Sequence, residues 1–400
     1  MHKLDVLSAE ESPIKGRLNV ESAVRERYAA AANNAEPALC CPIDYDARYL
    51  EILPAEIIER DYGCGDPSRY VREGETVLDL GSGGGKICYI AAQIVGPKGR
   101  VVGVDRNDDM LALARRYQDE VGKRIGYRNT EFRKGSIQDL ALDLEAFEAY
   151  LAEHPIHAAN DWLRAEAFAD ELRHASPMIA DESIDVVISN CVLNLVREAD
   201  RRQLFEEVYR VLRVGGRAAI SDIVCDEPVP EHLKHDHELW SGCISGAFVE
   251  SEFLSAFEAA GFHGLRIVDR QAQPWAVIEG IEFRSLTVEA FKGEQGECLD
   301  GHHAVIYRGP WKAVLDDDGQ TLHRGERMAV CARSFERFSQ PPYADEVFSI
   351  PPSEPVASED MQAMDCRGEQ TRDPRVTKGM QPHEDRLPGS ACCDGDSCCS

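Results

Sequence analysis

Long apolar runs are absent from this 400-residue sequence. No stretch approaches the roughly 18 consecutive apolar residues of a membrane-spanning helix, and the start, Met1-His2-Lys3-Leu4-Asp5, lacks the apolar segment of a signal peptide. Basic residues are also scarce, with 44 Lys and Arg against 71 Asp and Glu and a net charge of −27. Because phosphate binding needs clustered Lys and Arg, this balance argues against nucleic acid or an anionic membrane as the main partner. We therefore expect a soluble, cytoplasmic enzyme.

Cysteine, by contrast, is abundant, with fourteen residues. In a cytosolic chain, cysteines are more often catalytic or metal-binding than paired in structural disulfides. A single cysteine is most often a small buried apolar residue, and this interpretation suits Cys88, Cys225, Cys298 and Cys331. Cysteines beside glycine in loops are stronger candidates for chemistry, as are three adjacent pairs. These pairs are Cys40-Cys41, Cys392-Cys393 and Cys398-Cys399.

Residues 75–221 alternate between apolar strands and helices. Strands are predicted at 76–80, 100–104, 130–134, 183–190 and 216–221, and helices at 86–95, 110–121 and 200–212. Strands that alternate with helices are typical of βαβ units. We therefore predict an α/β fold with a doubly wound, mostly parallel sheet.

Composition divides the chain into four parts. Residues 1–73 are predicted to be mainly helical and carry Cys40, Cys41 and Cys64, and residues 74–260 form the α/β domain with an insertion at about 140–181. Residues 261–340 contain further strand-like runs, such as 265–268 and 283–288, and predict a smaller α+β domain. Residues 341–400 are rich in Pro, Glu, Asp and Ser, which predicts a flexible, disordered tail that ends in cysteines. Those last cysteines either collect a metalloid, exchange disulfides or are incidental.

A glycine-rich turn joins the first predicted strand to the first helix. In the stretch from Asp79 to Gly85, glycines allow the backbone to approach a ligand closely, and the helix that follows favours an anionic group. Asp79 could hold an ammonium group, and Asp105, at the end of the next strand, could accept hydrogen bonds from ribose hydroxyls. The turn alone would also suit a dinucleotide.

The layout from Glu75 to Ser221 resembles class I methyltransferases. The resemblance implies that S-adenosylmethionine binds at the carboxyl ends of the strands. The residues expected to bind it are Asp79, Gly81, Ser82, Gly83, Gly85, Asp105, Arg106, Ile137 and Asn190.

The substrate must be inferred from residues outside the cofactor motif, because one fold serves many substrates. Cys191 follows the fourth predicted strand, where this fold faces the methyl donor, and Cys243 lies among small residues in the run 238–247. Thiols at such positions favour a soft, thiophilic substrate.

Several stretches resemble the arsenite methyltransferases. They are Tyr62–Gly65, Ser189–Leu195, Ser221-Asp222, Glu238–Ala247 and Ala304–Trp311, and the likeness covers most of residues 20–340. The resemblance implies that Cys191 and Cys243 hold trivalent arsenic, that Cys64 is the family's third cysteine, and that Cys40 or Cys41 is its N-terminal one. The chain departs from the family at Lys86-Ile87, where Arg-Asp is common.

The implied reaction moves the methyl group of S-adenosylmethionine to thiolate-bound arsenic, in arsenic detoxification. Because methyl transfer oxidises arsenic, the resemblance implies that Cys64 with Cys40 or Cys41 reduces it, and that thioredoxin or glutathione restores these thiols. One alternative is a methyltransferase for antimony, tellurium, selenium or a small organic molecule. The other is an arsenic-binding protein without turnover.

Overall fold

The computed structural model describes residues 20–33 and 45–379. The chain divides into two compact units, with the boundary between Gly293 and Glu294. Cys40, Cys41 and the four cysteines after residue 391 lie outside the described residues, so the expectations for them stay predictions. Within the described ranges, no helix combines the length and the apolar character needed to cross a membrane.

The first unit is built from alternating helices and strands. Its helices are α1 (Val20–Asn33), α2 (Ala47–Leu50), α3 (Ala55–Glu59), η2 (Pro67–Tyr70), α4 (Lys86–Val95), η3 (Gly96–Lys98), α5 (Asp108–Ile125), α6 (Leu144–Glu153), α7 (Ala159–Ala175), η4 (Leu193–Leu195), α8 (Glu198–Val211), α9 (Glu231–Lys234), α10 (His237–Ser241) and α11 (Glu250–Ala259). Its strands are β1 (Thr76–Leu80), β2 (Arg100–Asp105), β3 (Thr130–Lys134), β4 (Ile184–Asn190), β5 (Leu212–Cys225), β6 (Phe248–Val249), β7 (His263–Arg270), β8 (Ala276–Ile278) and β9 (Ile281–Phe291).

Over the described residues these nine strands form one mixed sheet. Seven of them follow the order β3-β2-β1-β4-β5-β9-β7, while β6 pairs with β5 and β8 pairs with β9. The first five strands are parallel, and β9 joins β5 and β7 in antiparallel pairing. Every residue of β4 is buried, as expected for a central strand covered on both faces. The predicted α/β fold with a mostly parallel sheet is confirmed.

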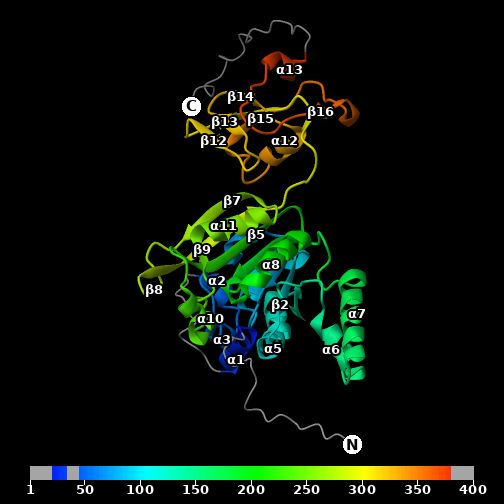
Figure 1. The fold of residues 1–400 in the computed structure, drawn as a ribbon, viewed down its shortest axis with the longest axis vertical. Coiled ribbons are helices and arrows are strands. Elements are labelled where there is room, and N and C mark those ends of the chain that lie inside the picture. Colours follow the sequence, from blue (N-terminus) through cyan, green and yellow to red (C-terminus); the bar gives the residue numbers. More distant parts are fainter. Residues whose placement is uncertain (1–19, 34–44, 380–400) are drawn as a thin grey trace, which may run out of the picture. The chain divides into compact units, whose positions relative to one another are not determined.

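Helices cover both faces of the sheet, so that the unit has three layers (Figure 1). Apolar residues of α4 and α5, such as Ile90 and Leu111, pack in one core cluster, and those of α8 and α11, such as Phe205 and Phe257, pack in another. The bounds of α5 follow from local chemistry. The Asn107 side chain accepts hydrogen bonds from the first-turn N–H groups of Asp109 and Met110, and Gly126 ends the helix in a left-handed conformation.

The predicted boundary at residue 260 is wrong. Strands β7 and β9, which were assigned from the sequence to a second domain, extend the sheet of the first unit, and β9 pairs with β5 from Arg217 to Cys225. Their strand character is readable from the sequence, but their partner strand is set by long-range pairing.

The predicted insertion forms a helical hairpin. Helices α6 and α7 lie side by side beside the β3 edge of the sheet (Figure 1). Arg173 of α7 pairs with Asp139, at 3.0 Å, in the loop that follows β3.

The second unit is folded well beyond the predicted domain end at residue 340. It contains β10 (Leu299–Asp300), β11 (Ala304–Tyr307), β12 (Ala313–Leu315), β13 (Thr321–His323), β14 (Arg327–Ala329), α12 (Ala332–Phe338), β15 (Val347–Ile350), η5 (Ser358–Asp360), β16 (Gln362–Ala363) and α13 (Pro374–Lys378). Val305, Met328 and Phe338 belong to its apolar core.

The prediction of a disordered tail from residue 341 is therefore wrong for the described part of that segment. Strand β15 pairs with β11, β16 pairs with β10, and Arg372 forms an ion pair with Asp300 at 2.6 Å. Strand β15 adds Val347 to the apolar core of the unit, whereas backbone pairing and ion pairs hold the more polar residues that follow.

Candidate active site

A pocket lies where the parallel strands of the first unit end. Its lining includes Asp79 and Gly81 at the end of β1, Asp105 at the end of β2, Gly135 after β3 and Cys191 after β4. Parallel strands bring residues that are distant in sequence to the same sheet edge, which is where this fold class binds ligands.

The glycine turn after β1 is shaped by close packing. Gly81 has a φ of +67°, and a Cβ atom at this position would lie 2.5 Å from the Val192 side chain. Gly83, with a φ of +51°, faces open space instead. The turn therefore excludes side chains at Gly81 and leaves room for a ligand at Gly83.

Two carboxylates flank this turn, Asp79, which is buried, and Asp105, which is half-buried. Burial raises the pKa of Asp79 to about 7, because a low-dielectric site disfavours the charged form. Burial also raises the pKa of Asp105, whose carboxylate accepts hydrogen bonds from the backbone N–H groups of Gly83, at 2.9 Å, and Asn107, at 2.8 Å. Asp105 thus holds the glycine turn as well as lining the pocket.

The chemistry of this pocket fits S-adenosylmethionine. A buried carboxylate such as Asp79 would be stabilised by a cationic ligand group, and the sulfonium cofactor carries an ammonium. The Ser82 hydroxyl, also in the lining, is buried without a hydrogen-bond partner among the described residues. A ligand donor or acceptor would satisfy it.

Eight of the nine residues predicted to bind the cofactor line this pocket: Asp79, Gly81, Ser82, Gly83, Asp105, Arg106, Ile137 and Asn190. Gly85 is outside the lining. It precedes α4 with a φ of +87°, and a Cβ there would lie 2.8 Å from the Phe132 ring. Gly85 therefore serves the packing of the turn.

Three of the predicted cysteines gather beside the pocket. Cys64 and Cys191 are joined as a disulfide with a Cα–Cα distance of 5.8 Å, and the Cys243 thiol donates a hydrogen bond to the Cys191 carbonyl at 3.3 Å. All three are buried in one apolar cluster, and Cys191 also lines the pocket. The Cys64–Cys191 bond was not predicted; Cys64 was expected to pair with Cys40 or Cys41.

The backbone at two of these cysteines is left-handed. Cys191 has a φ of +61° and Cys243 a φ of +64°, which is uncommon for residues other than glycine. Such conformations persist where the surrounding structure holds them, and they cluster at functional sites. They aim the two side chains in directions that ordinary backbone geometry would not allow.

Two residues that sequence reasoning did not select hold the cysteine loops in place. The Asp222 carboxylate on β5 accepts hydrogen bonds from the N–H groups of Leu193, at 2.8 Å, and Asn194, at 3.3 Å, just after Cys191. The Asn194 amide donates to the carbonyls of Ile223, at 2.6 Å, and Cys243, at 3.3 Å. Both lie in stretches that carried the family resemblance, but only the structure gives them this role.

Asp222 also lies close to the sulfur atoms. One of its oxygens and the sulfurs of Cys64 and Cys191 lie within 4.8 Å of one another. Burial raises the pKa of Asp222 to about 7. Tyr28 of α1 faces the same region, and burial, followed by the nearby Cys243, raises its pKa well above the ordinary value. Nothing in the Ala-rich sequence of α1 indicates that Tyr28 reaches the site.

Asn190 connects the cofactor pocket to the Cys64 loop. Its side-chain oxygen accepts from the N–H groups of Cys64, at 2.9 Å, and Gly65, at 3.0 Å, and its amide donates to the Gly65 carbonyl at 2.8 Å. A Cβ on Gly63 would collide with this amide at 2.1 Å. Gly63 is therefore needed for Asn190 to hold the loop, and Gly65 is needed for a different contact, since a Cβ there would lie 2.5 Å from the Ser221 hydroxyl.

Lys86, where the chain departs from the family pattern, is anchored beside the pocket. Its ammonium lies 2.9 Å from Asp61, a lining residue, and 3.8 Å from the centre of the Tyr45 ring. The substituted position thus still carries a paired cation.

The fold and the pocket together define an S-adenosylmethionine-dependent methyltransferase. A family model described as a methyltransferase domain matches residues 72–165 and 168–261, and a model described as a domain of unknown function matches residues 294–382. The second match begins where the structure begins its second unit.

Known relatives identify the family. An arsenite methyltransferase of Aquipseudomonas alcaligenes is 30% identical over 346 residues, which cover 81% of this chain and 89% of the relative. The human arsenite methyltransferase is 30% identical over 70% of this chain and 68% of its own length. The structure of an arsenic(III) S-adenosylmethionine methyltransferase from Chlamydomonas reinhardtii aligns with a TM-score of 0.53 and 25% identity, over 79% of this chain and 99% of that one. The chain belongs to the arsenite methyltransferase family.

Proposed function

We propose that this protein transfers the methyl group of S-adenosylmethionine to trivalent arsenic bound by the thiolates of Cys191, Cys243 and Cys64. One observation carries the proposal: Cys191 lines the pocket that contains Asp79 and Asp105, and it also belongs to the three-cysteine cluster. Trivalent arsenic held by these sulfurs, with its lone pair free to act as the nucleophile, would therefore meet the methyl donor.

Arsenic binding needs only thiol exchange. Each thiol replaces one hydroxide of arsenous acid, and its proton leaves with that hydroxide as water, so that arsenic stays trivalent and keeps its lone pair. The left-handed backbone at Cys191 and Cys243 fixes the directions of two of the ligands. Because the bound arsenic has no proton to lose, no general base is needed.

The cofactor, when bound, supplies an electrophilic methyl group on a sulfonium sulfur. Asp79 would pair with its ammonium and Asp105 with its ribose hydroxyls, so these carboxylates orient the donor. Orientation of two reactants by the protein can account for about 7–11 kcal/mol of a reaction barrier. Positioning is therefore the main contribution that these residues make.

The disulfide between Cys64 and Cys191 fits the step that follows. Methyl transfer uses the arsenic lone pair and raises arsenic to the pentavalent state. If two thiolate ligands leave as one disulfide, their two electrons return arsenic to the trivalent state. The structure joins Cys64 and Cys191 in such a bond, which supports these two as the first reducing pair. Cys40 or Cys41 would then act later, by attack on this disulfide.

Turnover then requires an external thiol. Two electrons from thioredoxin or glutathione would reopen the disulfide by thiol–disulfide exchange. The need for such a reductant is the reason for proposing that the enzyme works in the cytoplasm, in arsenic detoxification.

The test is a reaction with arsenite, labelled S-adenosylmethionine and a thiol reductant, with separation of the arsenic species formed. Methylated arsenic is expected from the wild-type protein. Its absence while the cofactor and arsenite both bind would favour an arsenic-binding protein without turnover. Methylation of tellurite, selenite or a small organic acceptor in preference to arsenite would overturn the substrate assignment.

A further inference from the structure

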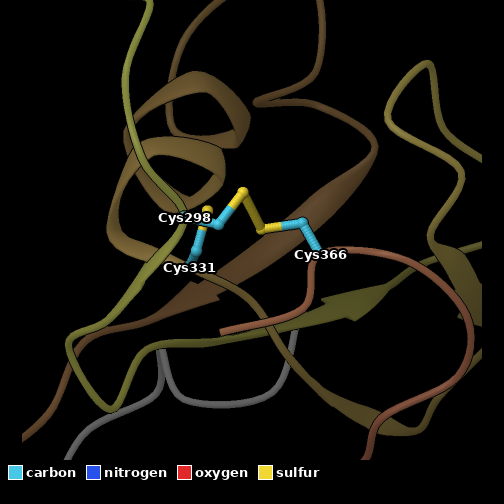
Figure 2. Close-up of side chains that lie close together, drawn as sticks. All are labelled: Cys298, Cys331 and Cys366. Carbon is cyan, nitrogen blue, oxygen red and sulfur yellow. A yellow bond between two sulfur atoms is a disulfide. The ribbon is translucent and has the colours of Figure 1, made fainter. Parts of the chain in front are cut away.

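A second group of cysteines lies entirely within the second unit. The sulfur atoms of Cys298, Cys331 and Cys366 are within 4.8 Å of one another, and Figure 2 shows the three side chains meeting from separate segments. Cys298 and Cys366 form a disulfide, and Cys331 is a free, buried thiol. Cys331 is buried, as predicted, whereas the disulfide of Cys298 was not predicted from the sequence.

Main-chain pairing brings two of these cysteines together. Cys298 directly precedes β10, and Cys366 follows β16, which pairs with β10 through Leu299 and Ala363. The N–H of Met364 also donates to the Cys298 carbonyl at 2.8 Å. Because these hydrogen bonds do not depend on the disulfide, the two thiols stay neighbours after reduction.

The third cysteine is fixed at the start of α12. The N–H of Ser334 donates to the Cys331 sulfur at 3.3 Å, and the N–H of Phe335 donates to its carbonyl at 2.9 Å. The guanidinium of Arg333, on the same helix, lies 3.4 Å from the Cys298 sulfur and is itself held by Asp318 at 3.1 Å. N–H donors of this kind typically surround ligands that are bound to a metal.

We propose that the reduced Cys298–Cys331–Cys366 cluster binds one trivalent thiophilic ion through three thiolates, and that this ion is arsenic(III). The choice of arsenic among thiophilic ions rests on the proposed function. Three ligands suit a three-coordinate ion with a lone pair, whereas structural zinc takes four. Among the described residues this cluster consists of three cysteines, each with one sulfur ligand atom. Three thiolates also neutralise a trivalent ion, which matters in a largely buried site.

Binding proceeds in two balanced steps. A dithiol reductant first gives two electrons and two protons to the Cys298–Cys366 disulfide and becomes a disulfide itself. The three cysteine thiols then exchange with arsenous acid, and their three protons leave with three hydroxides as water. Because the disulfide must first be reduced, the cluster takes up arsenic only under reducing conditions. Arsenic is not oxidised in either step, and the cluster does not methylate it.

The experiment uses the full-length chain with every other candidate arsenic ligand replaced by serine. The replaced residues are Cys40, Cys41, Cys64, Cys191, Cys243, Cys392, Cys393, Cys398 and Cys399. After reduction, this protein is titrated with arsenite in equilibrium dialysis, and the number of sulfur neighbours is measured by arsenic X-ray absorption. About one equivalent, bound through three sulfurs, is expected for a site with three thiolate ligands.

A further Cys331→Ser substitution supplies the decisive comparison. Its arsenite affinity should fall by more than the roughly 10–100-fold that follows loss of an outer-sphere partner, because a direct ligand is lost. Phenylarsenite takes only two thiolates, so its retained binding would show that Cys298 and Cys366 are still in place. Equal arsenite affinity with and without Cys331, no arsenite uptake after reduction, or tighter binding of zinc would each overturn the proposal.

This result is independent of methylation, because the titrated protein lacks Cys64, Cys191 and Cys243. If methylation fails in the wild-type chain while the titration succeeds, the proposed function is wrong and the second site stands. In an otherwise wild-type chain, Cys331→Ser should leave the methylation rate at saturating arsenite unchanged.

Discussion

The two cysteine clusters of this protein are built on different backbones. In the first unit, Cys191 and Cys243 are left-handed, and Cys191 faces a pocket shared with Asp79. In the second unit, Cys331 has an ordinary φ of −70°, and Cys298 and Cys366 lie next to paired strands. Both clusters bring three cysteines together, but only the first does so with unfavourable local geometry.

The difference indicates what each cluster needs. A left-handed backbone at a residue other than glycine costs about 1–2 kcal/mol. Its presence at both Cys191 and Cys243 indicates that the directions of these two side chains matter for function. Methyl transfer demands such aim, because arsenic must meet the cofactor in line. Binding an ion requires only that three sulfurs lie close together, and ordinary strands and a helix start provide that.

The largest expected effect separates the clusters by activity. Cys191→Ser and Cys243→Ser should each lower the single-turnover rate of arsenite methylation by several orders of magnitude, because each removes one of the proposed arsenic ligands. Cys331→Ser should not change this rate. The measurement is rapid quenching followed by separation of the arsenic species. Near wild-type rates for both Cys191→Ser and Cys243→Ser would show that arsenic is held elsewhere.

A pH series sharpens the contrast, since only the first cluster borders the pocket that contains Asp79. Asp79 has a pKa of about 7, so its carboxyl group is mostly protonated below pH 7. It must then give up a proton before it can pair with the cofactor's ammonium. Affinity for S-adenosylmethionine should therefore fall by up to about tenfold per pH unit below pH 7 and level off above it. Calorimetry between about pH 5.5 and 7.5 would test this. Asp79→Asn should bind weakly and show a flat profile; a sloping profile in that variant would assign the titration to another group.

A smaller effect should follow from loosening the first cluster without removing a ligand. Asn194→Ala deletes the amide that holds the Cys243 carbonyl, and misplacement of a ligand by about 1 Å can cost on the order of 100-fold in rate. The rate of methylation should fall while the affinity for S-adenosylmethionine stays unchanged. Ser334→Ala, which removes the hydroxyl beside Cys331, is the matched control in the second cluster and should leave the rate unaffected. An equal loss in both variants would point to general destabilisation.

The smallest effect is a reversal of sign in stability. At Cys191, with its φ of +61°, Gly should be more stable than Ala by about 1–2 kcal/mol. At Ser334, which contacts Cys331 from within α12, Ala should be more stable than Gly by about 0.5–1 kcal/mol. Urea unfolding of the four variants provides the comparison. The same order at both positions would contradict the backbone difference between the clusters.

The parallel strands and the cofactor pocket were largely predictable from sequence. Apolar runs mark β1 and β4, and Asp79, Gly81 and Asp105 follow strand ends at positions that the fold brings to one edge. These features depend on residues close together in the chain. That β7 and β9 belong to the sheet of the first unit was not predictable, because an apolar run does not specify which strand it will pair with.

The sequence by itself determined the methyltransferase fold, the glycine turn with its two carboxylates, and the identity of the first-unit cysteines as candidates. Only the tertiary structure decided which cysteines meet. The Cys64–Cys191 bond spans 127 residues and the Cys298–Cys366 bond spans 68. Local preferences act over a few residues, whereas these contacts follow from strand pairing and from side chains such as Asn190 that tie distant loops together. The spacing of the cysteines along the chain therefore does not predict which of them form either cluster.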